Sequence, residues 1–425
     1  MENDLIVKDG TKIAIIGGGP AGTSFAIKLL KESQKKGIRP KVIIFEGKDF
    51  NIHYNQCVGV LSPPIEEIFI NSLEIPFPTE LVKREISGYI IHPSGGPSLK
   101  ISRGLGTYAT RRILFDRFML KEAKNLGAEI INSRVTAVEF FNEKEVRIYS
   151  EGKFLRVDAV VGGFGLDEAT ASVFEKASSN TFKYKRPEKA LETIITKIHV
   201  PKEIIEGNLK SMIHAFLLKN IKKIEFGAIT PKGDHIIINI AGKNVSSSDM
   251  DLFLNQPETK EILGEIEFKE LDYFKGIYPI KPAKGVIGNR FVAIGDATGW
   301  IRPYKGKGIN VAIETGTKAA EVVLNYGFSK KALMKYLDYF KPLKKDYIYG
   351  KIFRTLVIFS LRTGFIKEIL KISKEDEKIN ESIYMAVSGE GKYKEVLEKI
   401  FSFNSFFKIS KGFLNFYLKK FNRNK

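Results

Sequence analysis

The stretch Ile13–Gly22 reads IAIIGGGPAG, an apolar strand that runs into the pattern Gly17-x-Gly19-x-x-Gly22. Gly17 permits a tight turn after the strand, Gly19 lets the backbone approach a pyrophosphate, and Gly22 lets a helix pack closely on the strand. Pro20 opens that helix, because its fixed φ suits the first helical turn. Free amides at the helix N-terminus can bind phosphate oxygens. We therefore predict a dinucleotide-binding turn formed by Gly17, Gly19, Pro20, Ala21 and Gly22.

A second predicted strand follows the helix and ends in an acidic residue. Lys41–Phe45 is apolar after its first residue, which is typical of a buried strand in a parallel sheet. Glu46 comes at the carboxyl end of this strand, where a carboxylate can accept hydrogen bonds from ribose hydroxyls. A glycine pattern alone also occurs in ordinary loops. The prediction therefore depends on the whole order of strand, glycines, helix, second strand and Glu46.

A distant segment indicates which dinucleotide binds. Phe291–Gly299 reads FVAIGDATG, an apolar strand followed by Gly295 and Asp296. An FAD molecule needs a polar group near its ribityl chain and backbone amides near its ring, and this turn offers both. The alternative is that Asp296 only caps the helix predicted over Gly308–Tyr326. In combination with the first segment, the pattern favours FAD.

Three segments carry a resemblance to a known family. The glycine turn, the run Arg112–Asp116 (RILFD) and the segment Gly295–Ile309 (GDATGWIRPYKGKGI) resemble the FAD-dependent oxidoreductases of the p-hydroxybenzoate hydroxylase type and, within them, the geranylgeranyl reductase family. The resemblance implies that Arg112 reaches the FAD and that Val135 contacts the adenine through its backbone. It also implies cofactor contacts from Gly295, Asp296, Pro303, Gly306, Gly308 and Ile309.

The segment Gln56–Leu61 (QCVGVL) is similar to the family's Cys-x-Gly-Gly-Leu loop, with Val60 in place of the second glycine. In the family this loop lies beside the flavin and the reacting end of the substrate. The resemblance implies that Cys57 is catalytic, as a proton donor or gate, and that Gly59 borders the substrate. The alternative is that Cys57 only fills apolar space, as many cysteines do.

The segment Phe226–Gly233 (FGAITPKG) is similar to the family's Tyr-x-Trp-x-Phe-Pro-Lys-Gly sequence, which lies on the floor of a lipid pocket. Here Phe226, Ala228 and Thr230 replace the three aromatic residues. The resemblance implies substrate contacts from Phe226, Pro231 and Lys232, and Lys232 would pair with a phosphate or lipid headgroup. The alternative is that Lys232 is an ordinary lysine of a turn.

By this resemblance the protein is expected to be an FAD-dependent reductase. It would transfer hydride from reduced FAD to a carbon–carbon double bond of an isoprenoid (geranylgeranyl) lipid and protonate the neighbouring carbon. Such a bond is unactivated, so we expect a dry pocket that places it against the flavin. Three other functions stay open: a flavin-dependent monooxygenase of the same fold, a non-catalytic FAD-bound lipid carrier or electron-transfer module, and a nicotinamide dehydrogenase.

Phe164 bears on the electron donor. It stands in Gly162–Gly165 (GGFG), where many relatives have an aspartate associated with cofactor and nicotinamide contacts. NAD(P)H is therefore one candidate donor, and a ferredoxin-like carrier is another. The formal net charge of +19 would suit an acidic carrier.

Composition limits the other classes of function. No nucleic-acid-binding motif accompanies the positive charge, so we expect no nucleic-acid partner. Cys57 is the only cysteine and the five histidines lack metal-ligand spacing, so we predict no metal site. The chain has no apolar run of ~20 residues and no signal-like N-terminus, which favours a cytoplasmic location.

The end of the chain suggests membrane contact. Residues 400–425 contain no acidic residue, and lysines such as Lys408 and Lys411 alternate with aromatic residues such as Phe403 and Phe407. A basic amphipathic helix of this kind can lie on a membrane as a peripheral anchor. The alternative is a terminal helix that docks its aromatic residues on the body of the protein.

We predict an α/β protein in four parts. A Rossmann-like FAD-binding domain would comprise residues 1–170, with an excursion over 51–110, and would be completed by residues 286–328. An antiparallel-sheet substrate domain would be inserted at 171–285, because its apolar runs alternate. Residues 329–425 would form a helical C-terminal region.

Overall fold

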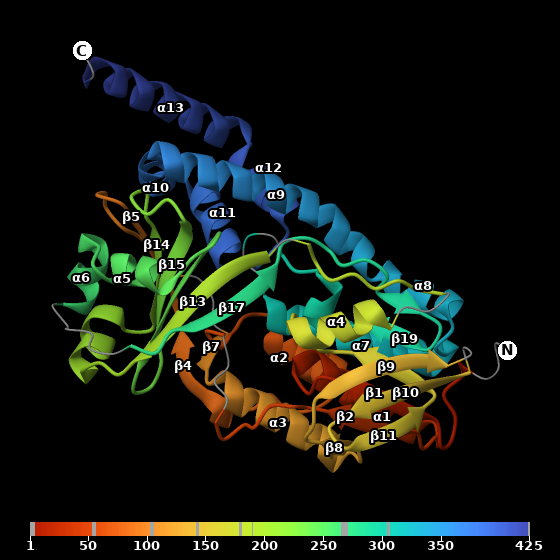
Figure 1. Ribbon diagram of the computed structural model, residues 1–425. Helices are drawn as coiled ribbons and strands as arrows, with labels where there is room; N and C mark the ends of the chain where they lie inside the picture. Colours follow the sequence, from red (N-terminus) through yellow and green to blue (C-terminus); the bar gives the residue numbers. More distant parts are fainter. Residues whose placement is uncertain are drawn as a thin grey trace.

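The computed structural model describes residues 5–52, 57–102, 106–141, 144–177, 181–188, 190–264, 271–302, 304 and 307–423. In this part the chain forms two large sheets, and a group of C-terminal helices lies across one side of the molecule (Figure 1). The predicted fold class is confirmed: an α/β dinucleotide-binding unit is combined with a second, largely antiparallel sheet and a helical C-terminal region.

The first sheet carries the glycine turn. Its central strand β1 (Lys12–Ile16) pairs in parallel with β2 (Lys41–Phe45) and β12 (Ala159–Gly162). All residues of β1 and β2 except the first of each are buried, as expected for strands inside a parallel sheet. The full order is β18 (Ile287–Gly288), β19 (Phe291–Ala293), β12, β1, β2 and β8 (Glu129–Ile131).

Helices join the first and last parts of this unit. α1 (Pro20–Lys35) packs against α7 (Gly308–Tyr326), and α3 (Arg112–Asn125) also contacts α1. The close approach of α1 and α7 requires Gly316, because a Cβ there would lie 2.4 Å from the carbonyl oxygen of Ala21. This packing brings the two motifs of the sequence together. A separate antiparallel sheet contains β9 (Val135–Phe141), β10 (Glu145–Ser150) and β11 (Lys153–Val157).

The second sheet has the order β17 (Phe274–Pro279), β13 (Ala190–Ile198), β16 (Ile236–Gly242), β15 (Ile224–Pro231), β14 (Met212–Leu217), β5 (Gly88–Pro93) and β6 (Leu99–Ile101). β5 and β6 belong to the 51–110 excursion, which the sequence assigned to the FAD-binding domain. They extend the second sheet instead, because β5 pairs in parallel with β14. One face of this sheet packs against α5 (Ser247–Leu254), where Phe216 meets Phe253 at a ring distance of 5.2 Å.

Shorter elements connect the two sheets. β7 lies between β3 and β4 in a small sheet next to the start of α3. α6 follows α5 and packs against η4. The bounds of these and the remaining short elements are β3 (Val60–Leu61), β4 (Val82–Ile86), β7 (Thr107–Thr110), α2 (Ile65–Glu67), α4 (Glu168–Lys176), α6 (Pro257–Leu263), η2 (Ile68–Leu73), η3 (Thr79–Leu81), η4 (Ile204–Leu209) and η5 (Gly295–Thr298).

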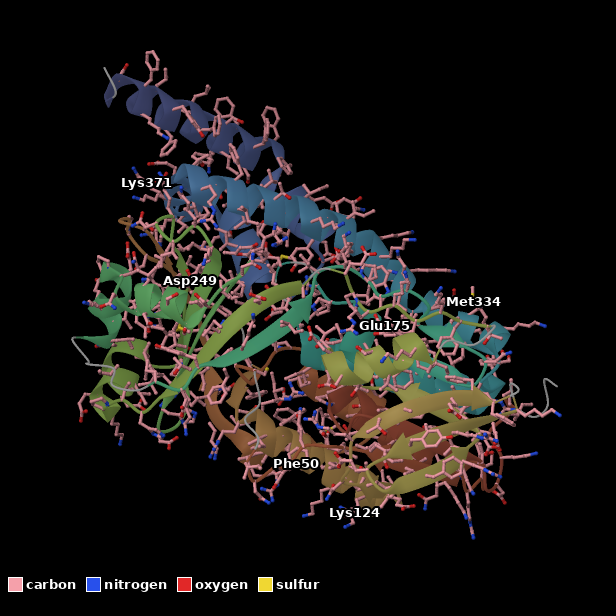
Figure 2. The ribbon with its side chains drawn as sticks, viewed as in Figure 1. Phe50, Lys124, Glu175, Asp249, Met334 and Lys371 are labelled. Atoms are coloured by element: carbon pink, nitrogen blue, oxygen red, sulfur yellow. The ribbon has the colours of Figure 1, made fainter. Side chains whose placement is uncertain are left out.

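The C-terminal region is helical, as predicted: α8 (Lys330–Asp338), α9 (Phe340–Thr363), α10 (Ile366–Ser373), α11 (Glu377–Ser388), α12 (Tyr393–Ile400) and α13 (Phe403–Arg423). α9 runs along one side of the molecule, and α13 projects beyond it (Figure 1). Figure 2 places Lys371 of α10 and Lys124 of α3 on opposite sides of the molecule. Among the described helices, none has the length and apolar character needed to cross a membrane.

Candidate functional site

A cavity of about 570 Å³ lies between the first sheet and the second. Residues of the glycine turn, of the Asp296 turn and of the second sheet all contribute to its lining. The structure therefore brings together segments that are far apart in the sequence. From the predicted site, the cavity is lined by Gly17, Gly19, Pro20, Ala21, Glu46, Cys57, Gly59, Arg112, Val135, Phe226, Asp296, Gly308 and Ile309.

The glycine turn has the geometry that its spacing predicts. Gly17 has a φ of +109°, and a Cβ there would lie 2.4 Å from the carbonyl oxygen of Gly163. A Cβ at Gly22 would lie 2.0 Å from the carbonyl oxygen of Gly17, so close packing of helix on strand requires glycine. A Cβ at Gly19 would meet no atom within 4 Å, because this residue borders the cavity. α1 then begins at Pro20 without a side-chain cap, which leaves its first amides available to an anion.

Glu46 and the start of β9 form one end of the cavity. Glu46 is buried, and its carboxylate accepts hydrogen bonds from the backbone N–H of Gly18 at 2.9 Å and of Lys48 at 2.9 Å. These bonds fix the carboxylate at the cavity wall. Val135 lies at the same wall beside Ser133, whose hydroxyl is buried and has no hydrogen-bond partner in the described part of the chain. Sequence reasoning missed Ser133, although it lies only two positions before Val135.

Asp296 lies in the η5 turn, after β19. It lines the cavity, and its Oδ1 is buried without a hydrogen-bond partner among the described residues. Burial raises the pKa of Asp296 to about 6, and Arg112 opposes this shift. The capping alternative is not observed, because α7 begins after Lys307 and has no side-chain cap. A buried acceptor without a partner points to a hydroxyl or amide of a ligand.

These features fit an FAD molecule. Residues 19–21 would hold the pyrophosphate, Glu46 the ribose hydroxyls and Asp296 the ribityl chain. The two unpartnered oxygens, Ser133 Oγ and Asp296 Oδ1, would each gain a partner. Gly308 lies beside Asp296, since a Cβ at Gly308 would be in van der Waals contact with Oδ1 at 3.6 Å. Pro303 and Gly306, which were also predicted to contact FAD, lie outside the described residues.

Not every predicted cofactor residue reaches the cavity. Gly22 lies behind the turn, where it permits helix packing. Gly295 lies behind Asp296; its φ is +61°, and its backbone N–H donates a hydrogen bond to the Thr315 hydroxyl at 2.9 Å. Both glycines shape the backbone that carries the lining residues.

Cys57 and Arg112 lie together at the cavity wall. Arg112 opens α3, and its Nε donates a hydrogen bond of 2.6 Å to Asp116, which is buried. Burial by itself lowers the pKa of Arg112, but Asp116 and Cys57 together raise it further than burial lowers it. The guanidinium is therefore charged beside the thiol. The Cys57 sulfur accepts a hydrogen bond of 3.4 Å from the backbone N–H of Gly59. Cys57 is half-buried and free.

Lys232 and Pro231 do not line the cavity. Lys232 was predicted to pair with a phosphate or headgroup, but its side chain is 1% exposed. Its ammonium donates instead to the carbonyl oxygens of Val58 at 2.8 Å, Gly59 at 3.1 Å and Thr110 at 2.9 Å. An ammonium has three N–H donors, and all three are used here. Pro231 ends β15 and is buried.

The second sheet forms the apolar wall of the cavity. Its side chains alternate, so every second residue of a strand faces the cavity. On β15 these residues are Phe226, Ala228 and Thr230, the three positions at which the sequence departs from the family pattern. The small Ala228 has Ala215 opposite it on β14. The other residues of this wall are Tyr89, Ile91, Thr193, Ile195, Ile213, Leu217, Asn239, Ala241, Ile277 and Tyr278.

Phe164 borders the cavity. Its ring stacks on Phe174 at 4.8 Å and meets Tyr184 edge-on at 5.7 Å. The position therefore contributes to an aromatic cluster rather than to a polar contact. This arrangement gives no support to a nicotinamide contact at this residue.

Relatives of known name resemble the chain over most of its length. Digeranylgeranylglycerophospholipid reductase 3 of Methanosphaera stadtmanae is 25% identical over 405 residues, which cover 87% of this chain and 89% of the relative. The predicted resemblance to the geranylgeranyl reductases is confirmed. A second relative, geranylgeranyl diphosphate reductase of Synechocystis, is 23% identical over 336 residues, or 74% of this chain and 75% of the relative. No family model matches the chain.

Solved structures share the fold. A geranylgeranyl bacteriochlorophyll reductase-like protein from Thermoplasma acidophilum superposes with a TM-score of 0.69 at 18% identity, over 92% of this chain and 99% of that one. The flavin-dependent brominase Bmp2 gives a TM-score of 0.66 at 16% identity, over 98% and 100%. CtdE, solved in complex with FAD, gives 0.60 at 16% identity, over 84% and 99%. The predicted cofactor, FAD, and the predicted enzyme class, an FAD-dependent oxidoreductase, agree with the geranylgeranyl reductase relatives and with this fold.

Proposed function

We propose that the protein is an FAD-dependent reductase that saturates carbon–carbon double bonds of an isoprenoid lipid. One observation carries the proposal: a single cavity is lined on one side by the residues that fit FAD and on the other by an apolar sheet. The names of its relatives, which are reductases of geranylgeranyl compounds, support the same substrate class.

The wall suits a hydrocarbon chain. Its lining from the second sheet is mostly aliphatic, aromatic or alanine, so binding a prenyl group there would remove apolar surface from water. Ala215 and Ala228 lie opposite each other on neighbouring strands and leave space beside the bulkier Phe226 and Leu217. Because Ala228 replaces a family tryptophan, we expect this protein to accept a bulkier part of a lipid at this point than such relatives do.

The residues around the reacting end of the lipid would have separate roles. Bound FAD would supply hydride chemistry when reduced. Cys57 lies at the junction of the cofactor side and the lipid side, where its thiol would donate a proton to the neighbouring carbon. Arg112 next to Cys57 would stabilise the negative charge left on sulfur until a proton returns. The apolar wall would exclude water from this point.

An anaerobic assay tests the proposal. Dithionite-reduced protein is incubated with a panel of lipids that contains a diether lipid, a prenyl diphosphate, a prenylated quinone and a chlorophyll precursor, and each product is examined by mass spectrometry. We expect a gain of two hydrogens for each double bond that is reduced. No gain with any of these lipids would contradict the proposed function.

Flavin-dependent oxygen chemistry is a second candidate, because a brominase shares the fold over nearly the whole chain. A monooxygenase would consume oxygen in proportion to reductant and add oxygen to the product. An FAD-bound lipid carrier or electron-transfer module would cycle its flavin without changing the mass of any lipid. The assay above separates these functions, provided that oxygen uptake is measured in parallel.

The electron donor of this reductase is either NAD(P)H or a ferredoxin-like carrier. We propose the carrier, because Phe164 leaves no carboxylate at the position that relatives use and because a chain of net charge +19 attracts an acidic protein. Flavin reduction is measured by its absorbance under anaerobic conditions. Reduction by a ferredoxin but not by NADPH would support this choice. Rapid reduction by NADPH alone would contradict it.

Replacing the only thiol tests its role in protonation. We expect Cys57→Ser to lower turnover by roughly tenfold to a hundredfold or more, because a serine hydroxyl is a much weaker acid than a thiol. FAD content should stay unchanged, since the hydroxyl still fits the loop. Turnover is measured by lipid mass and FAD by release on denaturation. Equal turnover in the variant would remove Cys57 from the mechanism.

We also propose that α13 lies on an anionic membrane surface. Five exposed apolar residues fall on one face of this helix, because their spacing of four, seven, four and three residues matches the helical period: Phe403, Phe407, Leu414, Leu418 and Phe421. Phe403 is 87% exposed. Lys411 lies on one flank of this face. The other flank of α13 docks on the protein, since Phe413 and Phe416 contact Phe365.

α9 lies on the same side of the molecule as α13 (Figure 1) and carries a second set of exposed apolar residues. This set consists of Ile348, Ile352, Leu356 and Phe359, which are also spaced by helical turns. The cavity reaches toward these helices, because Val387 of α11 contributes to its lining. A lipid could therefore enter the cavity from a membrane bound at this side.

The membrane proposal predicts a loss of vesicle binding. We expect the triple variant Phe407→Ser, Leu414→Ser and Leu418→Ser to bind vesicles of phosphatidylcholine and phosphatidylglycerol roughly a hundredfold more weakly, because each buried apolar side chain contributes ~1.5–3 kcal/mol at most. Binding is measured by co-sedimentation. The control Ile70→Ser removes an exposed apolar residue far from α13 and should bind normally. Unchanged binding by the triple variant would contradict the proposal.

A further inference from the structure

We propose that Lys232 is a positioning residue, whose ammonium fixes the Cys57 loop (residues 57–61) to the lipid-binding sheet. The inference rests on the proposed function, in which Cys57 meets the lipid. It assigns to Lys232 a role that is neither headgroup binding nor an ordinary place in a turn.

The contacts of the ammonium carry this inference. Its three acceptors are backbone carbonyls, so the bonds do not depend on which side chains the loop has. Val58 and Gly59 belong to the Cys57 loop, and Thr110 ends β7, two residues before Arg112. One side chain therefore connects the segment that carries Cys57 with the segment that leads to Arg112.

Lys232 is itself fixed to the second sheet. It follows β15 directly, and its backbone N–H donates a hydrogen bond of 2.9 Å to the carbonyl oxygen of His235, which precedes β16. Arg84 of β4 donates to the carbonyl oxygen of Lys232 at 2.9 Å. β15 and β16 supply Phe226, Ala228, Asn239 and other residues of the apolar wall. The ammonium of Lys232 thus links the wall directly to the loop.

The loop has little freedom where Lys232 binds it. Gly59 has a φ of +70°, and a Cβ there would lie 2.5 Å from the carbonyl oxygen of Thr110. The backbone N–H of Thr110 donates a hydrogen bond of 2.8 Å to Gly59, and Gly59 donates to the Cys57 sulfur. Releasing the ammonium would therefore loosen the contact that orients the thiol.

The cost of this arrangement argues for a specific role. An ammonium that is 1% exposed has lost its hydration, and an apolar side chain would fill the same space without that cost. Burial accordingly lowers the pKa of Lys232 to about 7, while Cys57 opposes the shift. The three hydrogen bonds of the Lys232 side chain go to backbone carbonyls of two segments and therefore hold these segments in place.

Hydrogen exchange and kinetics of Lys232→Met test the proposal. Methionine has a similar length but donates no hydrogen bond. In the FAD-loaded protein we expect the amides of Gly59 and Thr110 to exchange about tenfold faster or more. For lipid reduction we expect kcat to fall about tenfold while KM for the lipid stays within about twofold, because the wall is unchanged. Lys232→Gln keeps two N–H donors on a shorter side chain and should give intermediate values. It replaces the methionine variant in the test if that variant does not fold.

A matched control separates positioning from stability. Lys28 is also a buried lysine, and it pairs with Glu32 and Glu74 at 3.2 Å each. Lys28→Met should lower the melting temperature but leave both amides and kcat unchanged. Unchanged exchange or unchanged kcat in the Lys232 variants, or equal changes in the Lys28 control, would overturn the inference. The exchange measurement needs no substrate and therefore tests the role of Lys232 separately from the proposed function. If the wild-type protein reduces no lipid, the proposed function is refuted, but the exchange data still show whether Lys232 holds the loop.

Discussion

Asp296→Asn is expected to lose most of its FAD. The carboxylate has one buried oxygen without a partner, and a bound cofactor hydroxyl would donate to it. A hydrogen bond to a charged group contributes ~1.5–3 kcal/mol, so the neutral amide should weaken FAD binding roughly tenfold to a hundredfold. Affinity is measured by titrating apoprotein with FAD and following flavin fluorescence. The control Asp338→Asn changes an exposed carboxylate of α8 and should bind FAD normally.

The same substitution should change how the stability of the apoprotein depends on pH. Burial raises the pKa of Asp296 from 3.8 to about 6, so the fold without cofactor favours the protonated carboxyl. Its stabilising contribution is complete below pH ~4 and is lost as the pH rises through about 6, and this loss amounts to about 3 kcal/mol. Asparagine does not titrate, so the melting temperature of the variant should vary less between these pH values. The same pH dependence in both proteins, or normal FAD binding by the variant, would contradict the role of Asp296.

The second large effect is expected at the apolar wall. Ala215→Trp would place an indole opposite Ala228, inside the part of the cavity assigned to the lipid. Overpacking costs ~1–3 kcal/mol when a space is already filled, so a lipid that must share this space should react roughly a hundredfold more slowly in kcat/KM. FAD content should stay normal, because the indole lies away from the cofactor residues. The reaction is followed by lipid mass.

A matched substitution shows whether position or bulk matters. Ala190→Trp adds the same side chain at the exposed first residue of β13, in the same sheet, and should leave kcat/KM unchanged. If Ala215→Trp reduces the lipid as fast as the wild type, the lipid does not bind at this wall. If it loses FAD as well, the indole disturbs more than the lipid side.

The cofactor half of the site could be predicted from the sequence because its signals are local. The positive φ of Gly17 and the close approach of Gly22 to Gly17 are backbone constraints that operate within one turn, whereas Gly19 has open space at the cavity. Glu46 likewise follows directly from the end of a strand. The pairing of this turn with Asp296 was predicted by taking the two patterns together, although nothing local shows that α1 packs against α7.

The lipid side was less predictable because it depends on pairing between distant strands. The alternation on β15 indicates that Phe226, Ala228 and Thr230 share a face, but not that β5 joins the same sheet. Lys232 shows the limit most clearly. A lysine after Pro231 in a turn is usually exposed, and only the arrival of the Cys57 loop and of Thr110 explains why this one is buried. The outward face of α13 also depends on which flank docks on Phe365.

A single-turnover measurement tests the central claim most directly, namely that one cavity brings reduced flavin and an isoprenoid double bond together. The protein is reduced without oxygen, mixed rapidly with a geranylgeranyl lipid, and followed by flavin absorbance. We predict that the absorbance of oxidised flavin returns with one flavin reoxidised for each double bond saturated, and that this return is roughly a hundredfold slower in Ala215→Trp. If the flavin of the wild-type protein stays reduced with every lipid of the panel, the result contradicts the account.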